Sequence, residues 1–117
     1  MTIYLINPNT KAATTDRMVA VARTAAPGLR IAGVTAPFGA AMITDPAALA
    51  LSAEAVAAAL ADLPEPPEGV IIAAFGDPGL KAARASLPCP VLGIGETSFR
   101  AAATGGRRFG VATVTPG

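Results

Sequence analysis

Residues 70–80 read Val-Ile-Ile-Ala-Ala-Phe-Gly-Asp-Pro-Gly-Leu, an apolar run that passes abruptly into a helix start. The first five residues are all apolar, so a strand over 70–74 would be buried on both faces, as central strands of parallel sheets are. Asp77 before Pro78 predicts an N-cap followed by proline at the first helical position. This stretch therefore predicts a strand, a tight turn and a helix from Pro78 to about Ser86.

The same alternation of strand and helix extends in both directions from this stretch. Asp45 before Pro46 repeats the N-cap and proline pattern, and Pro27-Gly28 and Gly105-Gly106 are helix stops. Strands are expected over 2–6, 29–35, 90–94 and 109–113, and helices over 12–26, 46–63 and 96–104. The alternation predicts an α/β fold, with a flavodoxin-like parallel sheet that carries helices on both faces.

Length, charge and composition exclude several classes of function. The 117 residues allow one domain, and the net charge of +1 gives no basic face for a nucleic acid. No apolar stretch reaches the roughly 20 residues that a membrane span needs, and no leader precedes the first strand, so a cytoplasmic protein is expected. The absence of histidine excludes histidine-dependent catalytic dyads and triads and most zinc sites, and no metal site is expected.

Ligands of open parallel sheets bind beyond the carboxyl ends of the strands. That rule selects four loops, at residues 7–10, 36–45, 75–77 and 95–98. For the block 74–80 we keep two interpretations: a plain strand-to-helix turn, or a rim that binds a carboxylate through backbone N–H groups. The turn at 7–10 is likewise either a plain turn or a place where Asn9 and Thr10 reach a ligand.

Two other features carry weaker signals. Residues 93–98, Gly-Ile-Gly-Glu-Thr-Ser, are similar to a dinucleotide-binding loop, but Ser98 stands where the third glycine belongs, which argues against a nucleotide. Cys89, the single cysteine, cannot form an internal disulfide. It lies between two prolines at the entrance of its strand, so it should sit at the opposite end of the sheet from the four loops, as a small packed residue.

Four blocks of the sequence together resemble the Asp/Glu/hydantoin racemase superfamily, within its hydantoin and allantoin racemase branch. They are Ile-Asn-Pro-Asn-Thr at 6–10, Ala-Ala-Phe-Gly-Asp-Pro-Gly-Leu at 73–80 with Ala-Ala-Arg at 82–84, Pro-Val-Leu-Gly-Ile-Gly-Glu at 90–96, and Arg-Phe-Gly-Val-Ala-Thr at 108–113. Members of this family are about twice as long and fold as two similar lobes around one active site. The resemblance implies that residues 1–117 form a single lobe, the N-terminal half of such an enzyme.

The resemblance also implies a chemistry: cofactor-independent racemisation of amino acids or 5-substituted hydantoins by two cysteines, one from each lobe. One thiolate removes the proton beside a carbonyl and the other thiol returns a proton from the opposite face. The first cysteine directly precedes the Phe-Gly-Asp-Pro-Gly-Leu motif, where this chain has Ala74. A helix N-terminus behind that position would help to lower the thiol pKa.

The substrate-binding residues that the resemblance implies are Asn9, Thr10, Ile43, Thr44, Phe75 and Gly76. Backbone N–H groups around Phe75 and Gly76 would hold an enolate or carboxylate oxygen. The substrate is expected to be a small carboxylate or a hydantoin, with no metal, pyridoxal or nicotinamide cofactor.

Because alanine has no titratable group, the chain should not racemise by the two-thiol route. Ala74 has three open explanations: an engineered alanine that traps substrate, a divergence like that of arylmalonate decarboxylases, which lack the first cysteine and keep one proton donor, or a degenerate, inactive relative. A non-catalytic domain that binds small anions or a protein partner is the competing class. A half-enzyme would expose the apolar surface between its lobes, so self-association into a homo-oligomer is expected.

Overall fold

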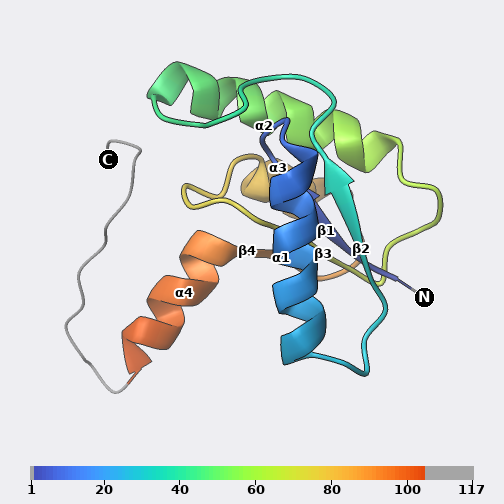
Figure 1. Cartoon of the computed structure of the whole chain (residues 1–117). Coiled ribbons are helices and arrows are strands. Elements are labelled where there is room, and N and C mark those ends of the chain that lie inside the picture. The colour runs from blue at the N-terminus through green and yellow to red at the C-terminus, as the bar shows by residue number, and fades with distance from the viewer. Residues whose placement is uncertain (1, 105–117) are drawn as a thin grey trace.

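The computed structural model describes residues 2–104, which form a four-stranded parallel sheet and four helices. The strands follow the spatial order β2-β1-β3-β4, as Figure 1 shows. In chain order the elements are β1 (Ile3–Asn7), α1 (Ala12–Ala25), β2 (Ile31–Thr35), α2 (Pro46–Ala61), β3 (Gly69–Ile72), α3 (Leu80–Ser86), β4 (Val91–Gly93) and α4 (Ile94–Ala102). The α/β class and the parallel sheet predicted from the sequence are confirmed. The strand predicted over 109–113 lies outside the described residues.

The sheet reverses its winding direction between β1 and β3. The chain passes from β1 to β2 on one side and then crosses to β3 on the other, so that Ile6 lies opposite both Val34 and Ile72. In doubly wound sheets, the carboxyl ends of the two strands that flank such a reversal form the crevice that receives ligands. The carboxyl ends of β1 and β3 are therefore the place where a ligand site is expected in this fold.

Alternate residues of the strands build two separate core layers. Tyr4, Ile6, Val70 and Ile72 belong to a layer that α2 and α3 cover, with Val56 of α2 fully buried in it. Side chains of the opposite face, such as Leu5 and Ile31, pack with α1. This alternation places helices on both faces of the sheet, as predicted; α1 lies in front of the strands in Figure 1.

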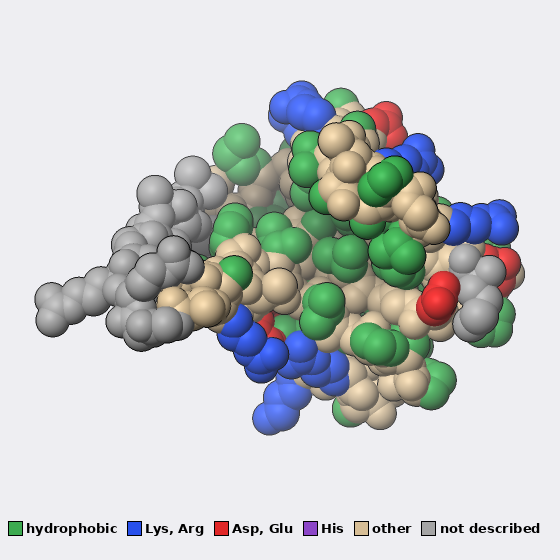
Figure 2. Space-filling model, turned by 90° about the horizontal axis from the view of Figure 1, so that it is seen from below, with side chains coloured by type: hydrophobic (Ala, Val, Ile, Leu, Met, Phe, Trp, Pro, Cys, Tyr) green, Lys and Arg blue, Asp and Glu red, His purple; other side chains and the backbone are tan. Residues whose placement is uncertain are grey.

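The face that carries α1 is only partly covered. A hollow of about 570 Å³ lies between α1 and the start of α4. Apolar side chains from the sheet and both helices line it, among them Leu5, Met18, Val21, Ile71 and Ile94. Leu92 of β4 is 45% exposed, and Figure 2 shows hydrophobic side chains gathered over the middle of one face. An apolar surface of this kind is what the predicted self-association requires, and that association stays a prediction.

The two Asp-Pro pairs behave differently in the structure. Asp45 caps α2 as predicted: its carboxylate accepts a hydrogen bond from the Ala48 N–H at 2.7 Å, and Pro46 begins the helix. The prediction for Asp77 is wrong, because α3 begins at Leu80 with Gly79 as its N-cap and contains only seven residues. The expected helix N-terminus directly behind residue 74 is therefore absent. A local signal was overridden here by a contact that Asp77 makes elsewhere in the fold.

Within residues 2–104, none of the helices combines the length and the apolar character needed to cross a bilayer.

Candidate functional site

Three loops meet at the carboxyl ends of β1, β2 and β3. The Ala36 N–H donates to the Asn7 carbonyl at 2.9 Å, and the Ala73 N–H donates to the Ile6 carbonyl at 2.9 Å. The Thr10 N–H donates to the Ala40 carbonyl at 3.1 Å, which ties the turn after β1 to the loop after β2. Residues 7–10 thus lie between the loop 36–45 and the turn 74–77, as the sheet order requires.

A buried amide network holds the turn after β1. The Asn7 side chain is fully buried, and its Nδ2 donates to Asn9 Oδ1, to the Lys11 carbonyl and to Thr15 Oγ1, at distances between 2.9 and 3.0 Å. Its Oδ1 accepts from the Asn9 N–H at 3.0 Å, and the Lys11 N–H donates to Asn9 Oδ1 at 2.9 Å. The side-chain oxygen of Asn9 therefore stabilises the turn. If this side chain contacts a ligand, the contact must be made by its Nδ2 group.

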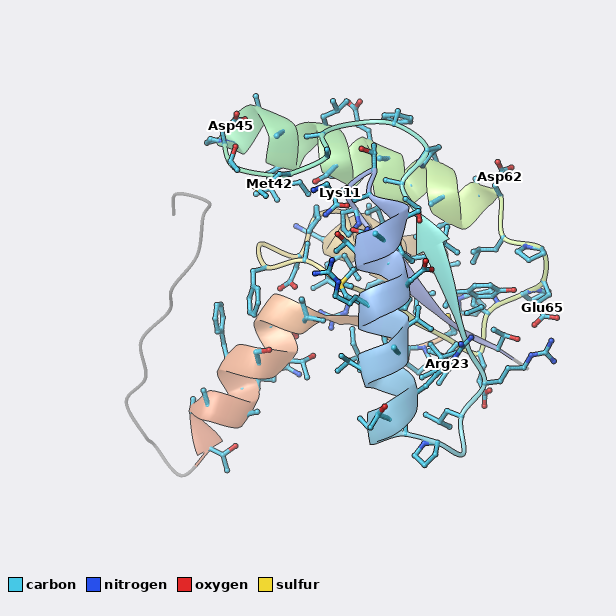
Figure 3. All side chains as sticks on the ribbon, viewed as in Figure 1. Lys11, Arg23, Met42, Asp45, Asp62 and Glu65 are labelled. Carbon is cyan, nitrogen blue, oxygen red and sulfur yellow. The ribbon has the colours of Figure 1, made fainter. Side chains whose placement is uncertain are left out.

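The loop before α2 brings the other two implied residues to the same end of the molecule. Ile43 is half-buried and Thr44 is exposed. Figure 3 shows Lys11 at the start of α1, at the end of the molecule where Met42 and Asp45 lie in the segment that leads into α2. The structure thus places this loop at the same edge of the sheet as the turns after β1 and β3. A ligand contact from Ile43 or Thr44 stays a prediction.

The turn after β3 is accessible to solvent. Ala74 is half-buried, Phe75 is 46% exposed and Gly76 is exposed. The Asp77 N–H donates to the Ala74 carbonyl at 3.2 Å and closes the turn, whereas the N–H groups of Phe75 and Gly76 donate to no other residue between 2 and 104. The turn thus presents two consecutive backbone donors at the edge where a ligand is expected.

Gly76 also allows this turn to approach α2. Its φ of +93° lies in the left-handed region, and a Cβ added there would meet Leu49 Cδ1 at 3.2 Å. On the other side of the turn, the ring of Phe75 lies 6.3 Å from that of Phe99 in α4, centroid to centroid. The turn is therefore held between α2 and α4.

Asp77 joins this turn to the first turn of α4. Its Oδ1 accepts from the Gly95 N–H at 2.9 Å and its Oδ2 accepts from the Glu96 N–H at 2.8 Å. The carboxylate thus satisfies N–H groups that a helix start leaves without intrahelical partners. Asp77 acts as a cap for α4, eighteen residues away, and not for α3.

The glycines of the 93–98 stretch make room for that carboxylate. A Cβ at Gly93 would lie 2.2 Å from Asp77 Oδ1, and a Cβ at Gly95 would lie 3.0 Å from both carboxylate oxygens. Close packing explains the Gly-x-Gly spacing without a nucleotide. This contact was missed from the sequence, although the spacing of the two glycines was its signal.

A second anchor from α3 holds the same turn of α4. Arg84 Nε donates to the Val91 carbonyl at 3.0 Å, and Arg84 Nη1 pairs with Glu96 Oε2 at 2.8 Å. Arg100 pairs with the other oxygen of Glu96 at 2.6 Å. The hydrogen bonds from Arg84, aided by the charges of both arginines, lower the pKa of the Glu96 carboxyl below its usual 4.5 despite some desolvation. Glu96 is therefore charged at neutral pH. Two residues of the block 73–84, Asp77 and Arg84, thus bind the first turn of α4.

Cys89 lies where the sequence placed it. It precedes β4, is half-buried, and packs against the core layer under α2 and α3. The neighbouring Pro90 carbonyl accepts from the Val70 N–H at the amino end of β3, far from the edge that carries residues 74–77. Across the described part of the chain, His, Cys, Asp and Glu side chains form no group of three or more that could bind a metal ion.

The chain is similar to proteins of one known family. The family model described as Asp/Glu/Hydantoin racemase matches residues 3–117. Over 99% of its length the chain is similar to two curated hydantoin racemases: it is 39% identical to that of Pseudomonas sp. (strain NS671), of which it covers 47%, and 29% identical to that of Paenarthrobacter aurescens, of which it covers 50%.

Two solved structures of allantoin racemases share the fold. For that of Pseudomonas fluorescens the TM-score is 0.79 at 32% identity, and for that of Klebsiella pneumoniae it is 0.76 at 37% identity. Each alignment covers 89% of this chain and 43% of the other. The chain spans about half the length of the relatives that it matches. On the evidence of its fold, its sequence blocks and these matches, the chain belongs to the Asp/Glu/hydantoin racemase family.

Proposed function

We propose that the edge formed by the ends of β1 and β3 binds a small carboxylate or a hydantoin, and that the chain acts as the N-terminal lobe of a racemase-type enzyme. The observation that carries the proposal is the turn 74–77. Its two consecutive N–H groups, of Phe75 and Gly76, have no partner among residues 2–104, and they lie where the sheet reverses its winding direction. The names of the relatives, hydantoin racemase and allantoin racemase, support the substrate class.

The proposed chemistry assigns different parts to the backbone and to the side chain at residue 74. Backbone N–H groups in a fixed turn stabilise negative charge that develops on a carbonyl oxygen, at no cost of reorganisation. The side chain at residue 74, directly before those groups, would stand beside the carbon that loses its proton. Alanine there can neither accept nor donate a proton. In this proposal the lobe binds and polarises substrate but is impaired in proton transfer, and racemisation also needs a second thiol from a second lobe.

Ala74 also supports a second candidate. An enzyme similar to arylmalonate decarboxylases needs one proton donor rather than two, and a small side chain at this position leaves space for a second carboxylate. A lobe that only binds anions is the third possibility. All three share the same oxygen-binding turn, and they differ in the reaction that follows binding.

We expect a 5-substituted hydantoin to bind the isolated chain weakly at this edge. The test is a titration of ¹⁵N-labelled protein with 5-methylhydantoin, followed by amide chemical shifts. The N–H signals of Asn9, Thr10, Phe75 and Gly76 should move together along one saturation curve. Indole serves as the apolar control, since it should enter the hollow lined by Leu5, Met18 and Ile71. Shifts from the hydantoin that are confined to that hollow would contradict the proposed site.

A further inference from the structure

We infer that Asp77 is a positioning residue: it clamps the turn 74–77 to α4, and thereby fixes the Phe75 and Gly76 amides for the ligand while closing the α4 N-terminus to it. This inference rests on the proposed function above. It assigns to Asp77 a part in ligand recognition that does not involve touching the ligand.

Asp77 is bonded through all of its polar atoms. Its N–H donates to the Ala74 carbonyl at 3.2 Å and its carbonyl accepts from the Leu80 N–H at 3.2 Å. Its carboxylate oxygens accept from Gly95 and Glu96, as described above. Because these bonds reach both ends of the turn and a separate helix, movement of the turn requires that several of them break at once.

The backbone of the turn needs such a clamp. Gly76, Asp77 and Gly79 have φ values of +93°, +48° and +76°. Asp77 is the only non-glycine residue with a positive φ in the described part of the chain. The left-handed region is unfavourable for residues with a Cβ, although Asp and Asn tolerate it better than most. An unfavourable backbone conformation persists only where surrounding contacts hold it in place. Here the two hydrogen bonds from the Asp77 carboxylate to α4 hold it.

The same bonds remove a competing anion site. The first N–H groups of a helix attract anions because they lack intrahelical partners and lie at the positive end of the macrodipole. At α4 the carboxylate of Asp77 already occupies those of Gly95 and Glu96. A ligand oxygen is therefore left with the donors of Phe75 and Gly76, next to residue 74, where proton transfer would occur.

The test compares three variants of the 117-residue chain by the hydantoin titration. Asp77→Gly removes the carboxylate and tolerates the left-handed backbone. Asp77→Asn keeps the backbone preference and one acceptor oxygen. Glu65→Ala is the control, because it removes a carboxylate that accepts a hydrogen bond from Thr2 at the amino end of β1, the edge of the sheet opposite the turn 74–77. All titrations are run under conditions in which the amide spectra show each variant to be folded.

We expect Asp77→Gly to weaken hydantoin binding at Phe75 and Gly76 about tenfold or more, the effect of losing charge-assisted hydrogen bonds that hold the turn. The ligand-induced shifts should move to the freed amides of Gly95 and Glu96, a change that a loss of stability alone does not produce. Asp77→Asn should recover part of the affinity, and Glu65→Ala should bind as the wild type does.

The inference is overturned if Asp77→Gly binds with wild-type affinity through the same amides, or if Glu65→Ala loses as much affinity as Asp77→Gly. Hydrogen exchange separates this failure from failure of the proposed function. If the wild type shows no hydantoin shifts, the site and the positioning role both fail. In that case, faster hydrogen exchange of the Gly95 and Glu96 amides in Asp77→Gly would still show that the Asp77 carboxylate binds them in the wild type.

Discussion

Ala74→Cys should give the 117-residue chain the ability to exchange the C5 proton of one enantiomer of a 5-substituted hydantoin for deuterium. A thiol with a pKa of about 8.5 supplies a general base at mildly alkaline pH, and a positioned base contributes about a hundredfold or more to proton transfer. The neighbouring N–H groups of Phe75 and Gly76 would stabilise the enolate. We expect exchange at least about a hundredfold faster than with the wild-type chain, measured by proton NMR in D₂O.

A single thiol reaches one face of the substrate, so the exchanged enantiomer should keep its configuration. Ala74→Ser is the matched control, because its hydroxyl has nearly the size of a thiol but does not ionise in this pH range. Cys89 is present in every variant, so it cannot account for a difference among them. Equal exchange rates for the cysteine and serine variants would contradict a substrate position beside residue 74. Carbon dioxide release from an arylmalonate by the wild-type chain would favour the decarboxylase candidate instead.

Asn7→Asp is expected to be the most destabilising of the conservative changes at the site. Asn7 is fully buried, and its Nδ2 faces three oxygen acceptors, which belong to Asn9, Lys11 and Thr15. Aspartate would place a buried charge against those oxygens in place of a donor. An uncompensated buried charge costs about 3–5 kcal/mol, out of a total stability of about 5–15 kcal/mol for a domain of this size. Urea unfolding followed by circular dichroism measures the loss.

Asn9→Asp is the same chemical change two residues away, and it should have little effect. The Oδ1 of Asn9 accepts from Asn7 Nδ2 and from the Lys11 N–H, and an aspartate oxygen can accept the same two bonds. The expected change in the free energy of unfolding is within about 0.5 kcal/mol, as for a surface substitution. Similar losses in the two variants would show that the buried amide network is not what holds the turn after β1.

Periodicity and turn residues were sufficient to predict most of the fold. The apolar run at 70–74 identified β3 as a central strand, and Asp45-Pro46 located the start of α2 to the residue. Both are local signals: consecutive apolar residues need burial on two faces, and an N-cap acts within one helical turn. The edge proposed to carry the site was selected from the parallel sheet alone.

The contacts between distant segments could not be predicted in this way. Asp77 has the same local sequence signal as Asp45, yet it caps α4, because the fold brings Gly95 and Glu96 within reach of its carboxylate. Sequence spacing does not reveal which of two helix starts lies nearer to a side chain. The sequence also did not show that the oxygen of Asn9 is used within its own turn, because a short polar segment can form several alternative sets of local hydrogen bonds.

Affinity labelling of the Ala74→Cys chain tests most directly whether residue 74 faces bound ligand. The chain then carries two thiols at opposite edges of the sheet, at 74 and 89, so each molecule contains its own control. A hydantoin with a chloroacetyl group is compared with plain chloroacetamide, and mass spectrometry of the peptides gives the ratio of labelling at the two positions. The account predicts that the hydantoin reagent shifts the ratio strongly towards residue 74 and that excess free hydantoin abolishes the shift. An identical ratio for both reagents would contradict it.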